Sequence, residues 1–130
     1  MQPEWYKILA VGSGGFIGAS SRYLLARGVD LYVPASNFPF GIAAVNILGC
    51  FLIGLLAGIF ELKQWVNPEV RLFIFVGLLG GFTTFSTFIN DSFMLWSRGE
   101  VALSILNIGV QVILGLVFVW LGFALIRWFS

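Results

Sequence analysis

The sequence predicts an all-α membrane protein with four transmembrane helices and a break in the third, and three observations support this fold class. Of the 130 residues, 59% are hydrophobic and only 10% are charged, whereas charged residues make up about 25% of an ordinary soluble domain. Four continuous apolar runs each approach or exceed the ~20 residues that a helix needs to cross the hydrocarbon layer. These runs lack the alternation of apolar and polar residues that is typical of a membrane β-barrel.

The predicted spans cover residues 8–26, 40–60, 72–96 and 101–128 of a single domain, 1–130. The first connection is rich in turn-forming residues: Gly28, Asp30, Pro34, Ser36, Asn37 and Pro39. In the second connection, Asn67 is expected to cap the third helix, with Pro68 in its first turn. The third connection, residues 97–100, is tight.

The composition also excludes several classes of function. The chain has no histidine and a single cysteine, Cys50, which excludes a Ser-His-Asp triad, a histidine-ligated metal and an intrachain disulfide. The net charge is +1 and the sequence has no basic run, so we expect no nucleic-acid partner. It shows no paired acid and base and no nucleotide-binding loop. We therefore do not expect an enzyme.

The basic residues are almost evenly divided between the two sides of the membrane. With four spans, the side of the N-terminus carries four of them: Lys7, Lys63, Arg71 and Arg127. The opposite side carries Arg27 and Arg98, and Arg22 if its side chain extends outward. Orientation is normally set by a clear bias in such residues. Two interpretations stay open: insertion in both orientations as an antiparallel pair, or a single orientation set by a small bias.

Glycines spaced four residues apart recur in three of the spans. The pairs are Gly14/Gly18, Gly54/Gly58 and Gly77/Gly81. This spacing lets helix backbones approach closely, either within one chain or between subunits. Because four helices enclose little interior, we expect a homodimer.

The third span carries the densest set of polar residues, from Gly80 to Asp91. Two glycines followed by Thr83 and Thr84 are unfavourable inside a helix and predict a break at bilayer depth. Carbonyls freed by such a break can bind a cation such as Na⁺. The alternative is a kinked helix whose hydroxyls bond to its own carbonyls.

After this break, phenylalanines alternate with hydroxyl residues. Phe85 and Phe88 are three residues apart and share a helix face. The positive edges of their rings can contact an anion, and the hydroxyls of Ser86 and Thr87 can donate hydrogen bonds to it. A lining of weak sites lets an ion enter without trapping it. Ordinary packing of the rings is the alternative.

Amides and two charges complete the polar residues of the spans. Asn46 lies centrally in the second span and needs a hydrogen-bond partner. Asn107 and Gln111 share one face of the fourth span, where they form either a polar track or interhelical bonds. Arg22 and Asp91 are the most deeply set charges; Arg22 either extends outward or attracts anions at a vestibule.

The third span resembles the signature of the Fluc/CrcB family of fluoride-specific ion channels. The matching string is Gly80-Gly81-Phe82-Thr83-Thr84-Phe85-Ser86-Thr87-Phe88. Further matches cover nearly the whole chain: Gly14-Gly15-Phe16-Ile17-Gly18-Ala19 with Arg22-Tyr23, Gly41 to Asn46 with Gly49 and Gly54, and Arg98-Gly99. The resemblance implies antiparallel dual-topology homodimers in a bacterial-type inner membrane, with two pores that passively release F⁻ from the cell and exclude chloride.

The resemblance also assigns residues. It places the family's pore phenylalanines at Phe85 and Phe88 and its pore asparagine at Asn46. A structural Na⁺, the expected cofactor, would bind backbone carbonyls of Gly80 and Thr83 from both subunits. The full expected fluoride pathway comprises Asn46, Thr84, Phe85, Ser86, Thr87, Phe88, Asp91, Asn107 and Gln111, with Arg22 at a vestibule. The sequence departs from the family at Ile89, where many members have serine, and at Asp91, where many have glutamate.

A small proton-coupled multidrug exporter is the main alternative, because that class is also short and four-helical. It requires an acidic residue inside the first span. The sequence has no acid between Lys7 and Arg22. We therefore expect the channel, with fluoride, membrane lipid and a second copy of the chain as its partners.

Overall fold

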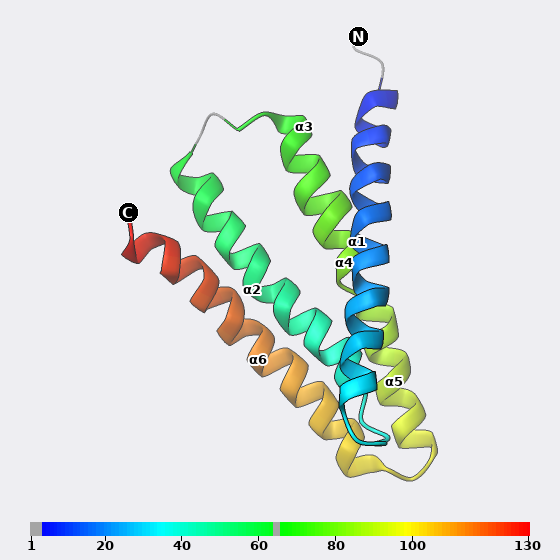
Figure 1. The fold of residues 1–130 in the computed structure, drawn as a ribbon. Helices are drawn as coiled ribbons and strands as arrows, with labels where there is room; N and C mark the ends of the chain where they lie inside the picture. Colours follow the sequence, from blue (N-terminus) through cyan, green and yellow to red (C-terminus); the bar gives the residue numbers. More distant parts are fainter. Residues whose placement is uncertain (1–3, 64–65) are drawn as a thin grey trace.

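The computed structural model describes residues 4–63 and 66–130, which are helical with short connections and contain no strand (Figure 1). Four helical rods follow one another along the chain. The first rod is α1 (Trp5–Tyr32), the second α2 (Phe40–Leu62) and the fourth α6 (Val101–Trp128). The third rod consists of α3 (Pro68–Arg71), the π-helix η1 (Leu72–Leu79), α4 (Gly80–Phe82) and α5 (Phe85–Ser97). The predicted helical class is confirmed.

Three helical regions in the described part of the chain are long and apolar enough to cross a membrane: Phe40–Leu62, Pro68–Ser97 and Val101–Trp128. Helix α1 is not among them. Its 28 residues extend for about 42 Å, so its length suffices, but four charged side chains lower its hydropathy: Lys7, Arg22, Arg27 and Asp30. The predicted span at 8–26 lies entirely within α1. However, α1 is less apolar than the three helical regions that could cross a membrane by length and composition.

The first connection is shorter than predicted, because α1 continues to Tyr32. Gly28 and Asp30 belong to the helix, and their assignment to the loop was wrong. Asp30 has a role that its turn propensity does not reveal. Its Oδ1 accepts a hydrogen bond from the Gly41 N–H at 2.9 Å, which satisfies one of the unpaired donors in the first turn of α2.

The other boundaries agree closely with the sequence. The fourth predicted span coincides with α6, and the second extends by two residues to Leu62. The third rod begins at Pro68, and Asn67 Oδ1 accepts a hydrogen bond from the Glu69 N–H at 2.8 Å. The predicted cap is thus confirmed. Gly99 adopts a φ of +82° in the connection before α6, a conformation that favours glycine.

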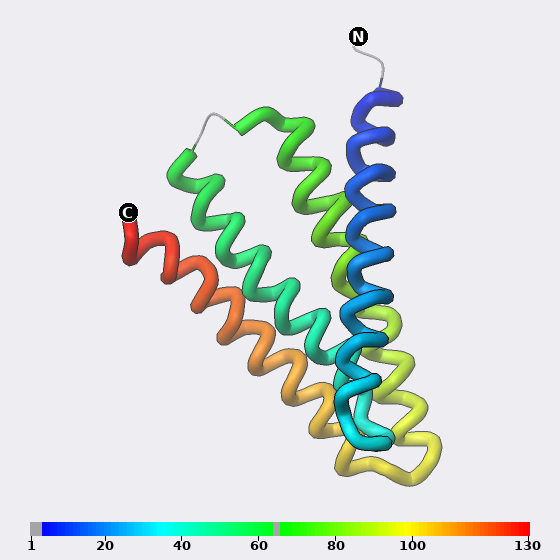
Figure 2. Tube along the Cα trace, in the orientation of Figure 1, coloured from blue at the N-terminus to red at the C-terminus, as the bar shows by residue number. Residues whose placement is uncertain are grey.

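The rods pack as two close pairs joined at the third rod (Figure 2). Helix α2 lies along α6, and α1 lies along η1 and α4, while α5 packs against α6 and bonds to it through Ser104 and Asn107. The start of α1 lies at the same end of the bundle as the end of α2 and the start of α3 (Figure 1). The opposite end carries the connections from α1 to α2 and from α5 to α6.

The predicted glycine pairs all pack within the chain. A Cβ at Gly14 or Gly18 would meet the backbone of the third rod, and one at Gly77 or Gly81 would meet the backbone of α1. A Cβ at Gly54 would meet the Val119 backbone of α6, and Gly58 faces Ile126. Of the two alternatives, intrachain packing is confirmed for these glycines.

Replacing Gly14 with alanine is expected to destabilise the fold by about 1–3 kcal/mol, because overpacking forces the backbones apart. The new Cβ would lie 2.5 Å from the Phe73 carbonyl oxygen and 2.9 Å from the Leu78 nitrogen. Thermal unfolding in detergent measures the effect. Gly12→Ala in the same helix is the control, because nothing lies within 4 Å of its new Cβ. Equal melting temperatures for the two variants would contradict the packing.

Candidate functional site

The third rod breaks at Thr83 and Thr84. Both residues are extended, with φ/ψ of −88°/159° and −149°/117°, while Gly80 and Gly81 remain helical. Helix α5 then starts at Phe85, and Thr84 Oγ1 accepts a hydrogen bond from the Thr87 N–H at 3.3 Å. The predicted break is confirmed, and its location follows from the preference of threonine for helix N-caps.

The break releases carbonyl groups from the helix, and those of Gly80 and Thr83 are among them. In a continuous helix the Thr84 N–H would donate to the Gly80 carbonyl and the Thr87 N–H to the Thr83 carbonyl. Here these two N–H groups donate to Asn46 Oδ1 and to Thr84 Oγ1. The predicted alternative is present beside the break, since Thr83 Oγ1 donates to the Leu79 carbonyl at 3.0 Å.

Arg22 donates a hydrogen bond to one of these released carbonyls. Its Nη1 donates to the Thr83 carbonyl oxygen at 3.2 Å. The guanidinium of α1 therefore reaches the break across the packed interface between α1 and α4. Arg22 also lines a hollow of about 510 Å³ with Tyr23, Arg27 and Asp30, which is the region where the sequence suggests a vestibule.

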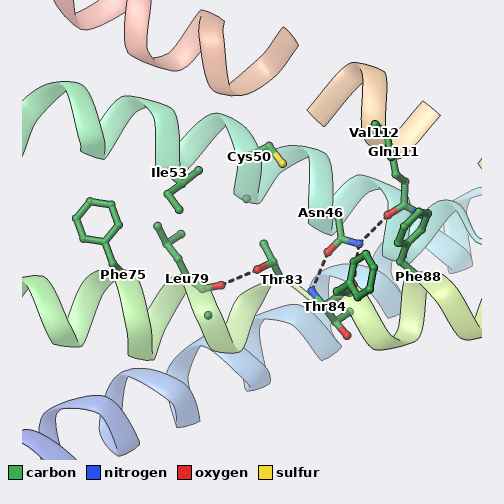
Figure 3. A pocket seen from close by; sticks show the side chains of 13 residues that line it. Asn46, Cys50, Ile53, Phe75, Leu79, Thr83, Thr84, Phe88, Gln111 and Val112 are labelled. Carbon is green, nitrogen blue, oxygen red and sulfur yellow. Dashed lines mark hydrogen bonds between the residues drawn. The ribbon is translucent and has the colours of Figure 1, made fainter. Parts of the chain in front are cut away.

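Asn46 pairs with the peptide groups of the break. Its Oδ1 accepts from the Thr84 N–H at 2.9 Å, and its Nδ2 donates to the Thr84 carbonyl at 3.1 Å. The same Nδ2 donates to Gln111 Oε1 at 2.7 Å. One side chain from α2 thus supplies the acceptor that the Thr84 N–H lacks and links the break to α6 (Figure 3). Asn46 therefore makes the interhelical hydrogen bonds that its position requires.

A chain of buried hydrogen bonds continues from Gln111. Gln111 Nε2 donates to Asn107 Oδ1 at 2.8 Å, and Asn107 Nδ2 donates to Ser92 Oγ at 2.9 Å. Ser92 Oγ donates in turn to the Phe88 carbonyl at 2.9 Å, while Ser104 Oγ donates to the Ser92 carbonyl at 2.7 Å. Sequence analysis missed both serines. Their signal is a small hydroxyl in an otherwise apolar run, within a helical turn or two of a predicted site residue.

A cavity of about 370 Å³ opens beside the break (Figure 3). Its walls come from α2, the third rod and α6, and they are mostly apolar. The lining residues are Asn46, Gly49, Cys50, Ile53, Phe75, Leu79, Gly80, Thr83, Thr84, Phe85, Phe88, Gln111 and Val112. Thus the fold brings seven predicted site residues to one cavity: Asn46, Gly80, Thr83, Thr84, Phe85, Phe88 and Gln111.

The two phenylalanines of the cavity differ in exposure. Phe88 is 5% exposed, whereas Phe85 is 74% exposed. Their ring centroids lie 5.8 Å apart in an edge-on arrangement. The Phe88 ring is therefore packed within the chain, and the Phe85 ring stands at the open side of the cavity.

Four predicted pathway residues lie outside the cavity lining: Ser86, Thr87, Asp91 and Asn107. Thr84 Oγ1 donates to Thr87 Oγ1 at 3.0 Å and lies 3.4 Å from Ser86 Oγ, so these hydroxyls form a cluster at the start of α5. Asn107 is fully buried. Asp91 lies farther along α5, where it is partly exposed.

A cavity with apolar walls and a few convergent polar groups, beside a broken helix, is typical of one class: helical membrane proteins that admit a small solute or ion. The chain belongs to the CrcB family, since the family model described as "CrcB-like protein, Camphor Resistance (CrcB)" matches residues 9–123. The resemblance noted from the third span is thereby confirmed. The family is one of ion channels and not of enzymes, and the chain is a multi-pass protein of the inner membrane.

Curated relatives are similar over most of their length. A protein of Prosthecochloris aestuarii is 39% identical over 130 residues, which cover 100% of both chains. A protein of Methylobacillus flagellatus is 38% identical over 122 residues, 94% of this chain and 95% of the relative. One from Elusimicrobium minutum is 45% identical over 113 residues, 87% of each. All three are named "Fluoride-specific ion channel FluC".

Proposed function

We propose that the chain is a fluoride-specific channel through which F⁻ leaves the cell passively. The observation that carries the proposal is the cavity beside the break, where the amides of Asn46 and Gln111 meet the rings of Phe85 and Phe88. The names of the curated relatives support the same ion. The membrane potential drives the efflux, because moving one charge across 100 mV changes its free energy by about 2.3 kcal/mol.

The chemistry of the cavity suits a small, strongly hydrated anion. Such an ion gives up water only if donors replace it, and amides, hydroxyls and ring edges can all do so. The cavity lining contains no formally charged side chain. Neutral donors bind the anion weakly enough for it to leave again. The biological need follows from acid chemistry: hydrogen fluoride enters as a neutral molecule, dissociates inside and is trapped as F⁻.

The functional unit we propose is an antiparallel dual-topology homodimer. The nearly even division of basic residues supports insertion in both orientations. A second argument comes from α5, where Ser86 and Asn90 are exposed one turn apart and Phe85 projects beside them. Polar groups facing lipid are costly. A second copy that covers this face removes that cost and closes the open side of the cavity.

A structural Na⁺ fits the carbonyls that the break releases. Backbone carbonyls are hard oxygen ligands, and those of Gly80 and Thr83 have lost the N–H partners that a continuous helix would give them. Each copy in a dimer would contribute these two oxygens. The ion would supply a central positive charge that holds the two breaks together. A carbonyl oxygen has two lone pairs, so the Arg22 bond to Thr83 leaves one for the ion.

Removing Na⁺ is expected to weaken the dimer, because the two breaks lose their shared ligand. The protein is purified in Na⁺ and exchanged into the larger organic cation N-methylglucamine at constant ionic strength. The dimer fraction is then measured by size-exclusion chromatography with light scattering, and we expect it to fall and to recover when Na⁺ is restored. A dimer fraction and fluoride flux that are indifferent to the exchange would remove the cation from the proposal.

Phe85→Ile is expected to abolish most of the fluoride flux, because isoleucine fills space but offers no positive ring edge. Phe93→Ile is the matched control, since Phe93 is also exposed on α5 (64%) and does not line the cavity. Efflux from liposomes, measured with a fluoride electrode, compares the two variants. Equal flux in both would show that the ring is a packing residue only.

The proposal as a whole is tested by reconstitution of the unaltered chain in liposomes. Fluoride efflux should be rapid and chloride efflux negligible under the same potential. Absence of fluoride flux, or chloride flux of equal size, would reject the channel. Export of a cationic drug driven by a proton gradient would favour the multidrug exporter. That exporter is disfavoured because the one acid in α1, Asp30, is used to cap α2.

A further inference from the structure

The amide of Asn46 has no hydrogen to spare for an anion. A side-chain amide carries two N–H donors and one carbonyl oxygen. Both Asn46 donors are taken, one by the Thr84 carbonyl and one by Gln111 Oε1. Its oxygen accepts from the Thr84 N–H. Both donors of Asn46 are therefore occupied, one at the break and one on α6.

The direction of every bond in the chain follows from Thr84. A backbone N–H can only donate and a carbonyl can only accept, so the Thr84 peptide groups determine which end of the Asn46 amide is oxygen. The Asn46 nitrogen then faces Gln111. Gln111 must accept this hydrogen bond with its oxygen, so its nitrogen faces Asn107. Asn107 likewise turns its nitrogen to Ser92, and the Ser92 hydroxyl donates a hydrogen bond to the Phe88 carbonyl. The two ends of the chain are thus backbone groups, and no amide within it can be reversed.

Gln111 is the member of this chain that retains a donor at the cavity. Its Nε2 uses one hydrogen on Asn107 Oδ1, and within the described residues nothing accepts the second. Gln111 lines the cavity beside Phe88 and Asn46 (Figure 3). Asn107 has the same bonding pattern but is fully buried and outside the lining. The available amide hydrogen at this site therefore belongs to Gln111.

We propose that Gln111 donates the amide hydrogen that meets fluoride in the cavity, and that Asn46, Asn107 and Ser92 are positioning residues that aim it. This inference rests on the proposed fluoride channel and reassigns roles within it. The donor lies on α6, while the groups that orient it lie on α2, at the break and on α5. Because the Gln111 amide is already bonded to Asn46 and Asn107, its remaining hydrogen can bind the anion without reorganisation of the side chain.

Side-chain amide NMR of the protein labelled with ¹⁵N at asparagine and glutamine tests the assignment directly. Titration with sodium fluoride, against sodium chloride, should shift the Gln111 amide protons more than those of Asn46. Assignment comes from the signals lost in Gln111→Met and in Asn46→Ser. A fluoride-specific shift at Asn46 that exceeds the shift at Gln111 would overturn the proposal, as would no shift at Gln111.

Flux measurements supply the second test. Gln111→Met keeps the length of the side chain and removes the donor, and we expect fluoride flux to fall roughly ten- to a hundredfold. Size-exclusion chromatography checks that this variant keeps its oligomeric state. If the unaltered chain conducts and Gln111→Met conducts equally, this inference fails alone. If the unaltered chain passes no fluoride, the channel itself fails.

The positioning role of Ser92 is tested with a matched serine. Ser92→Ala removes the last side-chain acceptor of the chain and is expected to move the Gln111 amide signals even without fluoride. Ser97→Ala is the control, because Ser97 Oγ donates only to the Phe93 carbonyl one turn back in α5. Gln111 signals that are unchanged in Ser92→Ala would contradict the positioning role.

Discussion

Asn46→Asp is expected to reduce fluoride flux at least about 100-fold, because a partly buried charge without a compensating partner is unfavourable. The aspartate keeps the shape of asparagine and the acceptor for the Thr84 N–H. It loses both donors, so carboxylate oxygen would face the Thr84 carbonyl and Gln111 Oε1 at distances that are now 3.1 and 2.7 Å. A negative charge beside the cavity also repels the anion.

Asn67→Asp is the matched control for this substitution. This substitution is the same chemical change at a position outside the predicted spans. The Asn67 Oδ1 caps α3 by accepting a hydrogen bond from the Glu69 N–H. Aspartate caps helices as well as asparagine does, so flux should stay at the unaltered level. Liposome efflux compares the two variants after size-exclusion chromatography of each. Wild-type flux in Asn46→Asp would show that the pathway does not depend on the break.

Trapping the chain in one orientation is expected to remove nearly all flux, because an antiparallel pair needs both orientations. Two lysines added after Ser130 bias one side of the membrane. Tyr32→Lys with Ala35→Lys biases the other, at exposed positions near the first connection. Since loop lysines favour the cytoplasmic side, each version should insert one way.

Co-expression distinguishes lost orientation from damaged protein. Each trapped version alone should be inactive, and the two together should restore flux, because each supplies the orientation that the other lacks. Fluoride efflux from cells and a C-terminal topology reporter measure activity and orientation in the same strains. Full activity of either version alone would exclude the antiparallel pair.

The helices were predictable from the sequence because their signals are local. Continuous apolar runs located all four rods, and Asn67 before Pro68 marked the start of the third. The end of α1 was misjudged, since Gly28 and Asp30 have turn propensity. What holds them in a helix is tertiary: Asp30 is bonded to Gly41 in α2. Such a contact joins residues 11 positions apart and leaves no periodic pattern.

The site was predictable to the level of residue types but not of bonding. Paired glycines and threonines predicted the break, and the spacing of Asn107 and Gln111 predicted their shared face. The sequence could not show that the Asn46 donors are both occupied, or that Ser92 ends the chain of amides. Those facts depend on which groups three separate rods bring within hydrogen-bonding distance of one another.

The pairing of Asn46 with Thr84 makes the break a product of assembly. A peptide of residues 68–97 alone lacks Asn46, the acceptor of the Thr84 N–H, and we expect its backbone to satisfy this group by closing into a continuous helix. We therefore expect the break to form when α2 docks against the third rod. In this protein the conformation of one membrane segment is therefore determined by a neighbouring helix and not by its own sequence alone.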